Sequence, residues 1–188
     1  MFATNYYAAE ICLYEVGFKL SSTTGVVYHD LGSLRLCDIL YACFQATRSW
    51  FDSYLSVSIE DSFTLNVTTF GQLFHAIGAL HKLSVFDIPE WDIAMVRETL
   101  DLSNLLGQIA LRVEDAGNLY SEEVKIQNNA WKFCAAKLRN CKIWWDSTLA
   151  QETDAFAGGR AWSEGFNEEL LPFMNFESFD EYFWQPMA

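Results

Sequence analysis

Histidines and cysteines are the residues of this chain best suited to catalysis or metal binding. They are His29, His75, His81, Cys12, Cys37, Cys43, Cys134 and Cys141. His75 and His81 are six residues apart, so on a helix they point in different directions and do not form the four-residue metal-binding pair. No two cysteines have C-x-x-C spacing, which argues against a zinc ribbon or a thioredoxin-like redox motif. We therefore expect no catalytic residue, metal site or cofactor, and histidines that lie on the surface or are hydrogen-bonded in the core.

The five cysteines are odd in number and widely spaced, which does not suit a disulfide framework. Most lie among apolar residues with helical spacing, where a free thiol behaves as a small hydrophobic side chain. This usage predicts a reduced, intracellular protein. The N-terminus lacks the basic and apolar stretches of a signal peptide, and no segment of 18 uncharged apolar residues is present.

The charge of the chain restricts its partners. Lys and Arg total 12 against 25 Asp and Glu, for a formal net charge of −13 in 188 residues. A field of this sign repels nucleic-acid phosphates and anionic membrane surfaces. We therefore expect no direct nucleic-acid or membrane binding by this chain.

Aromatic residues make up 16% of the sequence and gather in two places. The first group is Tyr41, Phe44, Trp50, Phe51 and, further along, Phe74. At helical spacing such residues form either a core or an apolar ligand pocket between helices, and both alternatives are open. An all-α enzyme or lipid carrier would need a polar cluster facing that pocket, through His75 or His81.

The second group lies near the C-terminus, where acids alternate with large apolar residues and residues 161–188 contain no Lys or Arg. This composition is typical of amphipathic activation segments that bind partners. On a helix, several of these side chains would form one apolar edge for helix-in-groove recognition. The alternative is a C-terminal helix that completes the core. The candidate anchors for a co-activator, or for docking onto the chain itself, are Leu170, Leu171, Phe173, Phe176, Phe179, Phe183 and Trp184.

The elements that must position these residues are helices. Apolar residues recur at three- and four-residue steps in five stretches, and no alternating strand pattern is present. The expected helices cover residues 4–20, 33–55, 68–83, 89–117 and 121–149. In the first, we expect Tyr6, Ala9, Leu13, Val16 and Leu20 to face the core. The fold class is therefore all-α, with about five long amphipathic helices in an irregular bundle or repeat-like array and an acidic aromatic C-terminal segment.

The expected organisation has three parts. Residues 1–150 form a helical regulatory domain, residues 151–165 a linker that includes Gly158 and Gly159, and residues 166–188 the activation-like segment.

A series of short segments resembles the C-terminal half of fungal zinc-cluster transcription factors. The series comprises YYAAEICLYEVGF at 6–18, LCDILYACF at 36–44, WFDSYLS at 50–56, FGQL at 70–73, ALHKLS at 79–84, IPEWD at 88–92 and VRETLDL at 96–102. The resemblance runs in order from about residue 5 to 115. The six-cysteine zinc cluster and its basic flank are absent from the sequence, so neither zinc nor DNA binding carries over to any residue here.

The resemblance implies a nuclear regulatory and transactivation region of a fungal transcription factor rather than an enzyme. Such a region controls activity through a partner protein or an apolar small molecule, and its C-terminus contacts a co-activator. The alternative is an all-α small-molecule-binding protein or enzyme with an apolar cavity.

Overall fold

The computed structural model describes residues 2–16, 18, 30–62, 67–88, 90–119 and 127–157. All regular structure in these ranges is helical and no strand occurs in them, which confirms the all-α prediction. The segment at 166–188, with its candidate anchors, lies outside the described residues. The helices are α1 (Phe2–Tyr14), α3 (Asp30–Ser56), α4 (Ile59–Ser62), α5 (Val67–Val85), α6 (Ile93–Thr99), α7 (Leu102–Leu119) and α8 (Gln127–Ala157).

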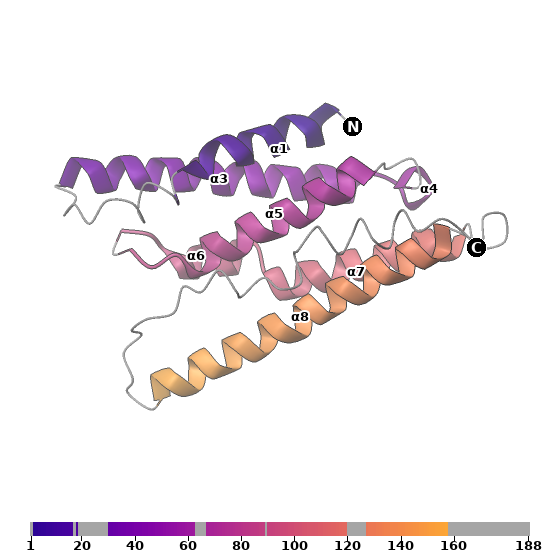
Figure 1. Cartoon of the computed structure of the whole chain (residues 1–188). Coiled ribbons are helices and arrows are strands. Elements are labelled where there is room, and N and C mark those ends of the chain that lie inside the picture. The colour runs from indigo at the N-terminus through magenta and orange to yellow at the C-terminus, as the bar shows by residue number, and fades with distance from the viewer. Residues whose placement is uncertain are drawn as a thin grey trace. The chain divides into compact units, whose positions relative to one another are not determined.

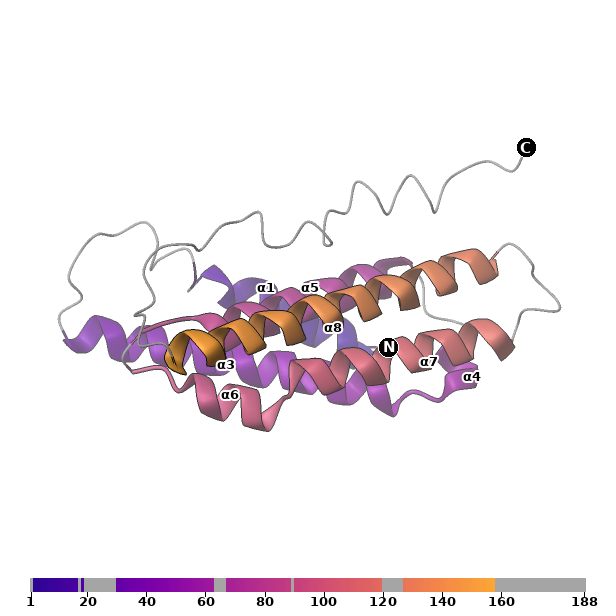
Figure 2. The ribbon, with the colours of Figure 1, turned by 90° about the horizontal axis from the view of Figure 1, so that it is seen from below.

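The chain divides into two compact units, residues 1–102 and 103–188. The boundary lies inside the range that we expected to be one helical domain. In the first unit, α1 packs against α3 and α5, and α5 also packs against α3 and α6. Figure 1 shows α1 beside the long α3, and Figure 2 shows the same helices after a quarter turn.

The core of the first unit follows the predicted helical periodicity. From α3 and α5 the buried apolar side chains larger than alanine are Leu36, Leu40, Cys43, Phe44, Trp50, Phe51, Tyr54, Phe70, Leu73, Phe74, Ile77, Leu80 and Leu83. α3 buries one apolar stripe, whereas α5 is buried on most of its circumference, with every residue from 76 to 81 buried. Burial of apolar helix surface is the main source of helix stability in a folded domain.

The prediction for the first helix was wrong about its buried face. Tyr6, Leu13 and Val16 are 60%, 65% and 49% exposed, whereas the buried residues are Thr4, Ala8 and Ile11. Ala9 is also exposed, and Leu20 lies outside the described residues. The helix is apolar around most of its circumference, so spacing alone does not identify the face that packs against α3 and α5.

Three other boundaries differ from expectation. The helix expected at 89–117 is two helices, because the backbone leaves helical geometry at Leu100 (φ −139°, ψ 83°) between α6 and α7. The loop expected at 56–67 contains the short helix α4, and α8 continues to Ala157 through the first part of the expected linker. Asp92 begins α6 as its N-cap, with a side-chain oxygen 2.9 Å from the backbone nitrogen of Met95.

In the second unit, α7 and α8 run antiparallel and are joined by polar contacts. Lys142 donates to Ser103 at 2.6 Å and to Asp146 at 2.6 Å, Ser103 donates to Asp146, and Arg139 pairs with Glu114 further along. Gly107 faces the aliphatic stem of Lys142, which a Cβ would approach to 3.7 Å. Within the described residues, no helix has the length and apolar character needed to cross a membrane.

Candidate functional site

A cluster of polar side chains lies where α1 meets α5 in the first unit. Cys12 is on α1, Glu15 follows the last residue of α1, and His75 and Lys82 are on α5. We call these four residues the Cys12 cluster. His75 and Lys82 are seven residues apart, so two helical turns bring them to the same face of α5. The buried Ala8 and Ile11 hold α1 in place, which fixes the position of the cluster.

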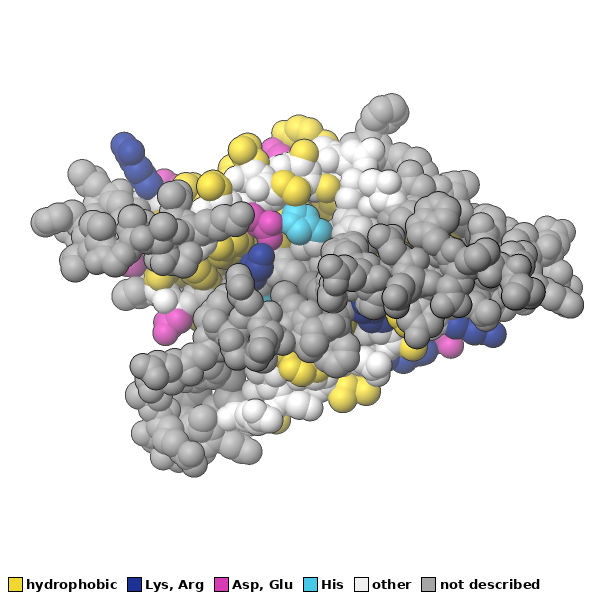
Figure 3. Space-filling view, viewed as in Figure 1, with side chains coloured by type: hydrophobic (Ala, Val, Ile, Leu, Met, Phe, Trp, Pro, Cys, Tyr) yellow, Lys and Arg dark blue, Asp and Glu magenta, His cyan; other side chains and the backbone are white. Residues whose placement is uncertain are grey.

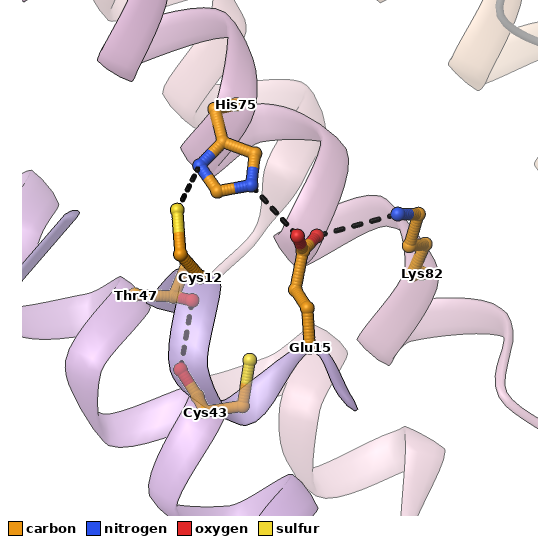
Figure 4. A network of polar contacts seen from close by, with 6 residues as sticks. All are labelled: Cys12, Glu15, Cys43, Thr47, His75 and Lys82. Atoms are coloured by element: carbon orange, nitrogen blue, oxygen red, sulfur yellow. Dashed lines mark hydrogen bonds and ion pairs between the residues drawn. The ribbon is translucent and has the colours of Figure 1, made fainter. Parts of the chain in front are cut away.

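His75 links the two α1-side partners (Figure 4). Its Nδ1 lies 3.8 Å from the Cys12 Sγ, and its Nε2 lies 2.8 Å from a carboxylate oxygen of Glu15. An ionised carboxylate only accepts hydrogen bonds, so the Nε2 of a neutral ring carries the proton and donates it to Glu15. The Nδ1 lone pair then faces the thiol. The thiol, the imidazole and the carboxylate therefore form a connected series of nucleophile, base and orienting acid.

Lys82 completes the electrostatics of the cluster. Its Nζ lies 3.3 Å from the second carboxylate oxygen of Glu15 and 5.8 Å from the centre of the Phe18 ring. Burial by itself would raise the pKa of Glu15, but the hydrogen bond from His75 and the positive charge of Lys82 hold that pKa below its usual value. Glu15 therefore remains ionised at neutral pH and keeps His75 in one tautomer.

The cluster is open to solvent. The side chains of His75, Glu15 and Lys82 are 31%, 20% and 36% exposed, and Cys12 is exposed. Figure 3 shows histidine, acidic and basic side chains grouped on this face beside hydrophobic ones. Such exposure does not suit an enclosed active site with strongly shifted pKa values, but it leaves the thiol accessible to a small reagent. In the part of the chain that the structure describes, no three His, Cys, Asp or Glu side chains are placed to hold a metal ion.

Comparison with known proteins places this helical chain in a family. A family model described as a C-terminal domain, ATEG07667_C, matches residues 59–184, which is more than half of the chain. The chain belongs to this family. The match includes His75 and Lys82 of the Cys12 cluster and the expected activation-like segment up to residue 184.

A curated relative agrees with the fungal resemblance. The protein named "Transcription factor opdL" from Penicillium oxalicum is 29% identical over 112 residues, which are 60% of this chain and 19% of that protein. The chain thus spans about a fifth of the length of this relative. Together, the two matches support a fungal transcription-factor C-terminal region, and neither of them shows a zinc cluster. No solved structure matches significantly.

The residues predicted to line an apolar pocket in this C-terminal domain fall into two groups. Phe44, Trp50, Phe51 and Phe74 are at most 3% exposed, whereas Tyr41 is 50% exposed with its ring 6.5 Å from that of Phe44. Trp50 stacks on Tyr54 at 5.2 Å, yet its indole Nε1 is buried and has no hydrogen-bond acceptor among the residues that the structure describes. A buried donor without an acceptor is uncommon in proteins, so Trp50 is the position to which the ligand prediction points most directly.

Sequence reasoning missed the Cys12 cluster. Most of the five cysteines were expected to behave as small hydrophobic side chains, but Cys12 is exposed and contacts His75. His75 is hydrogen-bonded, as expected, and its partner Glu15 lies within the 6–18 segment that carried the family resemblance. The seven-residue spacing of His75 and Lys82 was the available signal. The spacing alone does not reveal that α1 brings an acid to that face of α5.

Proposed function

We propose that this chain is a regulatory and transactivation region of a fungal transcription factor that acts in the nucleus. In this proposal the helical part responds to a partner protein or an apolar small molecule, and the C-terminal segment contacts a co-activator. The observation that carries it is the relationship to a C-terminal domain family and to a relative named as a transcription factor. The same relationship favours a non-catalytic role.

Exposed apolar side chains support the partner-binding part of the proposal. Tyr6, Leu13 and Val16 of the α1 region are each about half exposed or more. Apolar side chains at helical spacing on an exposed face suit a helix that docks on another protein. The acidic aromatic segment at 166–188 supplies a second binding element of different chemistry.

The buried donor of Trp50 supports the small-molecule part. An apolar ligand with one carbonyl or hydroxyl oxygen would accept a hydrogen bond from the Nε1 atom of Trp50, whose ring lies beside those of Phe51 and Tyr54. The free energy of one buried hydrogen bond, about 1 kcal/mol, would add to that of apolar burial.

A reporter assay tests the activation function. The whole chain is fused to an unrelated DNA-binding domain, and activation is compared with that of the Phe176→Ala/Phe179→Ala variant of the same fusion. We expect activation by the double variant to be at least about tenfold lower, because removing two aromatic anchors from a short recognition segment weakens binding by more than about 1.4 kcal/mol.

Leu111→Ala/Ile143→Ala is the matched control, since it removes two large apolar side chains that are 60% and 63% exposed in the helical part. Both variants must accumulate in the nucleus to the level of the parent fusion. Equal activation by the parent and the Phe176/Phe179 variant would refute the role of this segment, and no activation by the parent would refute the transactivation proposal itself.

A further inference from the structure

The Cys12 cluster contains the groups that activate a thiol: a base beside the sulfur and a carboxylate on the other side of that base. The Cys12 Sγ faces the unprotonated Nδ1 of His75, and the opposite ring nitrogen donates to Glu15 at 2.8 Å. Lys82 holds the other oxygen of Glu15 at 3.3 Å. A thiol reacts as its thiolate, so an imidazole that accepts the proton makes the sulfur nucleophilic without requiring a low resting pKa.

The other cysteines of the described residues lack this arrangement. Cys43, Cys134 and Cys141 are buried, and burial raises the pKa of Cys43 and of Cys134 to about 12. Cys37 is partly exposed, and burial together with the charges of Glu90 and Asp38 raises its pKa. Cys12 is the exposed cysteine, and it contacts a histidine.

The surroundings of Cys12 select the kind of reagent. Leu13 is its neighbour on α1, and Val16 lies one helical turn further on; both are about half exposed or more. An apolar molecule therefore gains contact area at the position where the thiol is accessible. A small uncharged electrophile fits this surface better than a bulky charged one.

We propose that Cys12 is a covalent modification site for a small apolar α,β-unsaturated carbonyl compound. The thiol proton passes to the Nδ1 of His75 while the sulfur attacks the β-carbon. The carbon–sulfur bond forms as the carbon–carbon π bond breaks, and the α-carbon then takes up one proton from the imidazolium or from water. The sum is an addition without a leaving group, an oxidant or a cofactor, and His75 returns to its neutral form.

The chemistry of this site is independent of transcription, so it is tested on the purified chain. The full-length protein is incubated with 2-cyclohexen-1-one at pH 7.5, and the adduct at each cysteine is followed over time by peptide mass spectrometry. We expect the adduct at Cys12 to form at least about tenfold faster than at Cys37, and also faster than on free N-acetylcysteine at the same pH.

Two substitutions separate activation from simple exposure. His75→Gln removes the base but retains a side chain that can hydrogen-bond to Glu15, and we expect it to slow addition at Cys12 about tenfold or more. Glu15→Gln should produce a smaller decrease, since it removes the charge that orients and polarises the ring. His81→Gln is the matched control, because it changes a histidine of the same helix that lies outside the cluster, and it should leave the rate unchanged.

Circular dichroism of each variant verifies that the helices are retained. In 8 M urea all five cysteines should react at similar rates, which shows that the advantage of Cys12 depends on the fold. The proposal is overturned if native Cys12 reacts no faster than Cys37, or if the folded His75→Gln variant reacts as fast as the parent. Neither result would bear on the reporter assay, so the two proposals fail separately.

Discussion

At the scale of single residues, burial gives two histidines of one helix different properties. His75 is part-exposed and hydrogen-bonded to Glu15, whereas His81 is only 8% exposed. Burial, with the positive charges of Lys82 and Arg97, lowers the pKa of His81 from 6.5 to about 4. In the folded chain His81 is therefore neutral at pH values where the unfolded chain already carries a proton on it.

This difference predicts a loss of stability in mild acid. Between about pH 6.5 and pH 4 the unfolded state binds a proton at His81 that the native state lacks, so the free energy of unfolding falls as the pH falls. The full contribution is about 3 kcal/mol. The free energy of unfolding, measured by urea titration at several pH values, should fall over this window in the parent. In His81→Gln the fall should be smaller by about 3 kcal/mol. His75→Gln should retain the contribution of His81, and equal slopes for His81→Gln and the parent would contradict the assignment.

Residue roles were predictable where burial followed from spacing. Phe44, Trp50 and Phe51 are buried because the long α3 carries one apolar stripe, which its sequence shows. Contacts between helices were not predictable in the same way. Cys12 and His75 are 63 residues apart, and the face that α1 presents to α5 determines whether they meet.

At the scale of elements, the connection between α5 and α6 ends one helix by using side chains of the next segment. The last carbonyl groups of a helix have no partner inside it. The indole nitrogen of Trp91 donates to the Leu83 carbonyl oxygen at 2.9 Å, and the Nε of Arg97 donates to that of Ser84 at 2.9 Å. Both carbonyls are in the last turn of α5, so residues after the helix satisfy its C-terminus.

A pair of tryptophan substitutions measures this capping. Trp91→Phe removes a donor and leaves a buried carbonyl without its partner, whereas Trp50→Phe removes an Nε1 for which the described part of the chain offers no acceptor. The two changes delete the same atoms from buried rings. We expect Trp91→Phe to lower the free energy of unfolding by about 1–3 kcal/mol more than Trp50→Phe does. Urea titration followed by circular dichroism measures both values. A cost for Trp50→Phe as large as that for Trp91→Phe would mean that the Trp50 donor is hydrogen-bonded in solution.

Element boundaries were predictable where the sequence carries a strong signal. Asp92 suits an N-cap, and the start expected near residues 89–92 is close to the observed start of α6 at Ile93. The break at Leu100 has no proline or glycine to announce it, so apolar periodicity continues from α6 into α7 and predicts a single helix. The buried face of α1 was missed because that helix offers apolar side chains in several directions, and packing on α3 and α5 chooses among them.

At the scale of the whole molecule, the net charge is strongly negative. The 188 residues carry a formal net charge of −13, and the expected activation-like segment contributes acids without a single Lys or Arg. The relative named as a transcription factor is about five times as long as the stretch that matches it. We therefore propose that contact with DNA belongs to other parts of such a protein, while this chain contacts proteins or small molecules.

This view predicts that the isolated chain does not bind DNA. Non-specific DNA affinity comes mainly from Lys and Arg side chains that displace condensed counterions, and here 25 acids outnumber 12 bases. Fluorescence anisotropy with a labelled duplex in about 50 mM salt should show no saturable binding below about 100 μM, the weak end of non-specific affinity. The same chain fused to an unrelated DNA-binding domain is the positive control and should bind that domain's site. The prediction fails if the unfused chain binds the duplex and this binding weakens as the salt concentration is raised. Its Lys and Arg residues would then form a local basic patch that outweighs the negative net charge, and a DNA contact would lie inside this region.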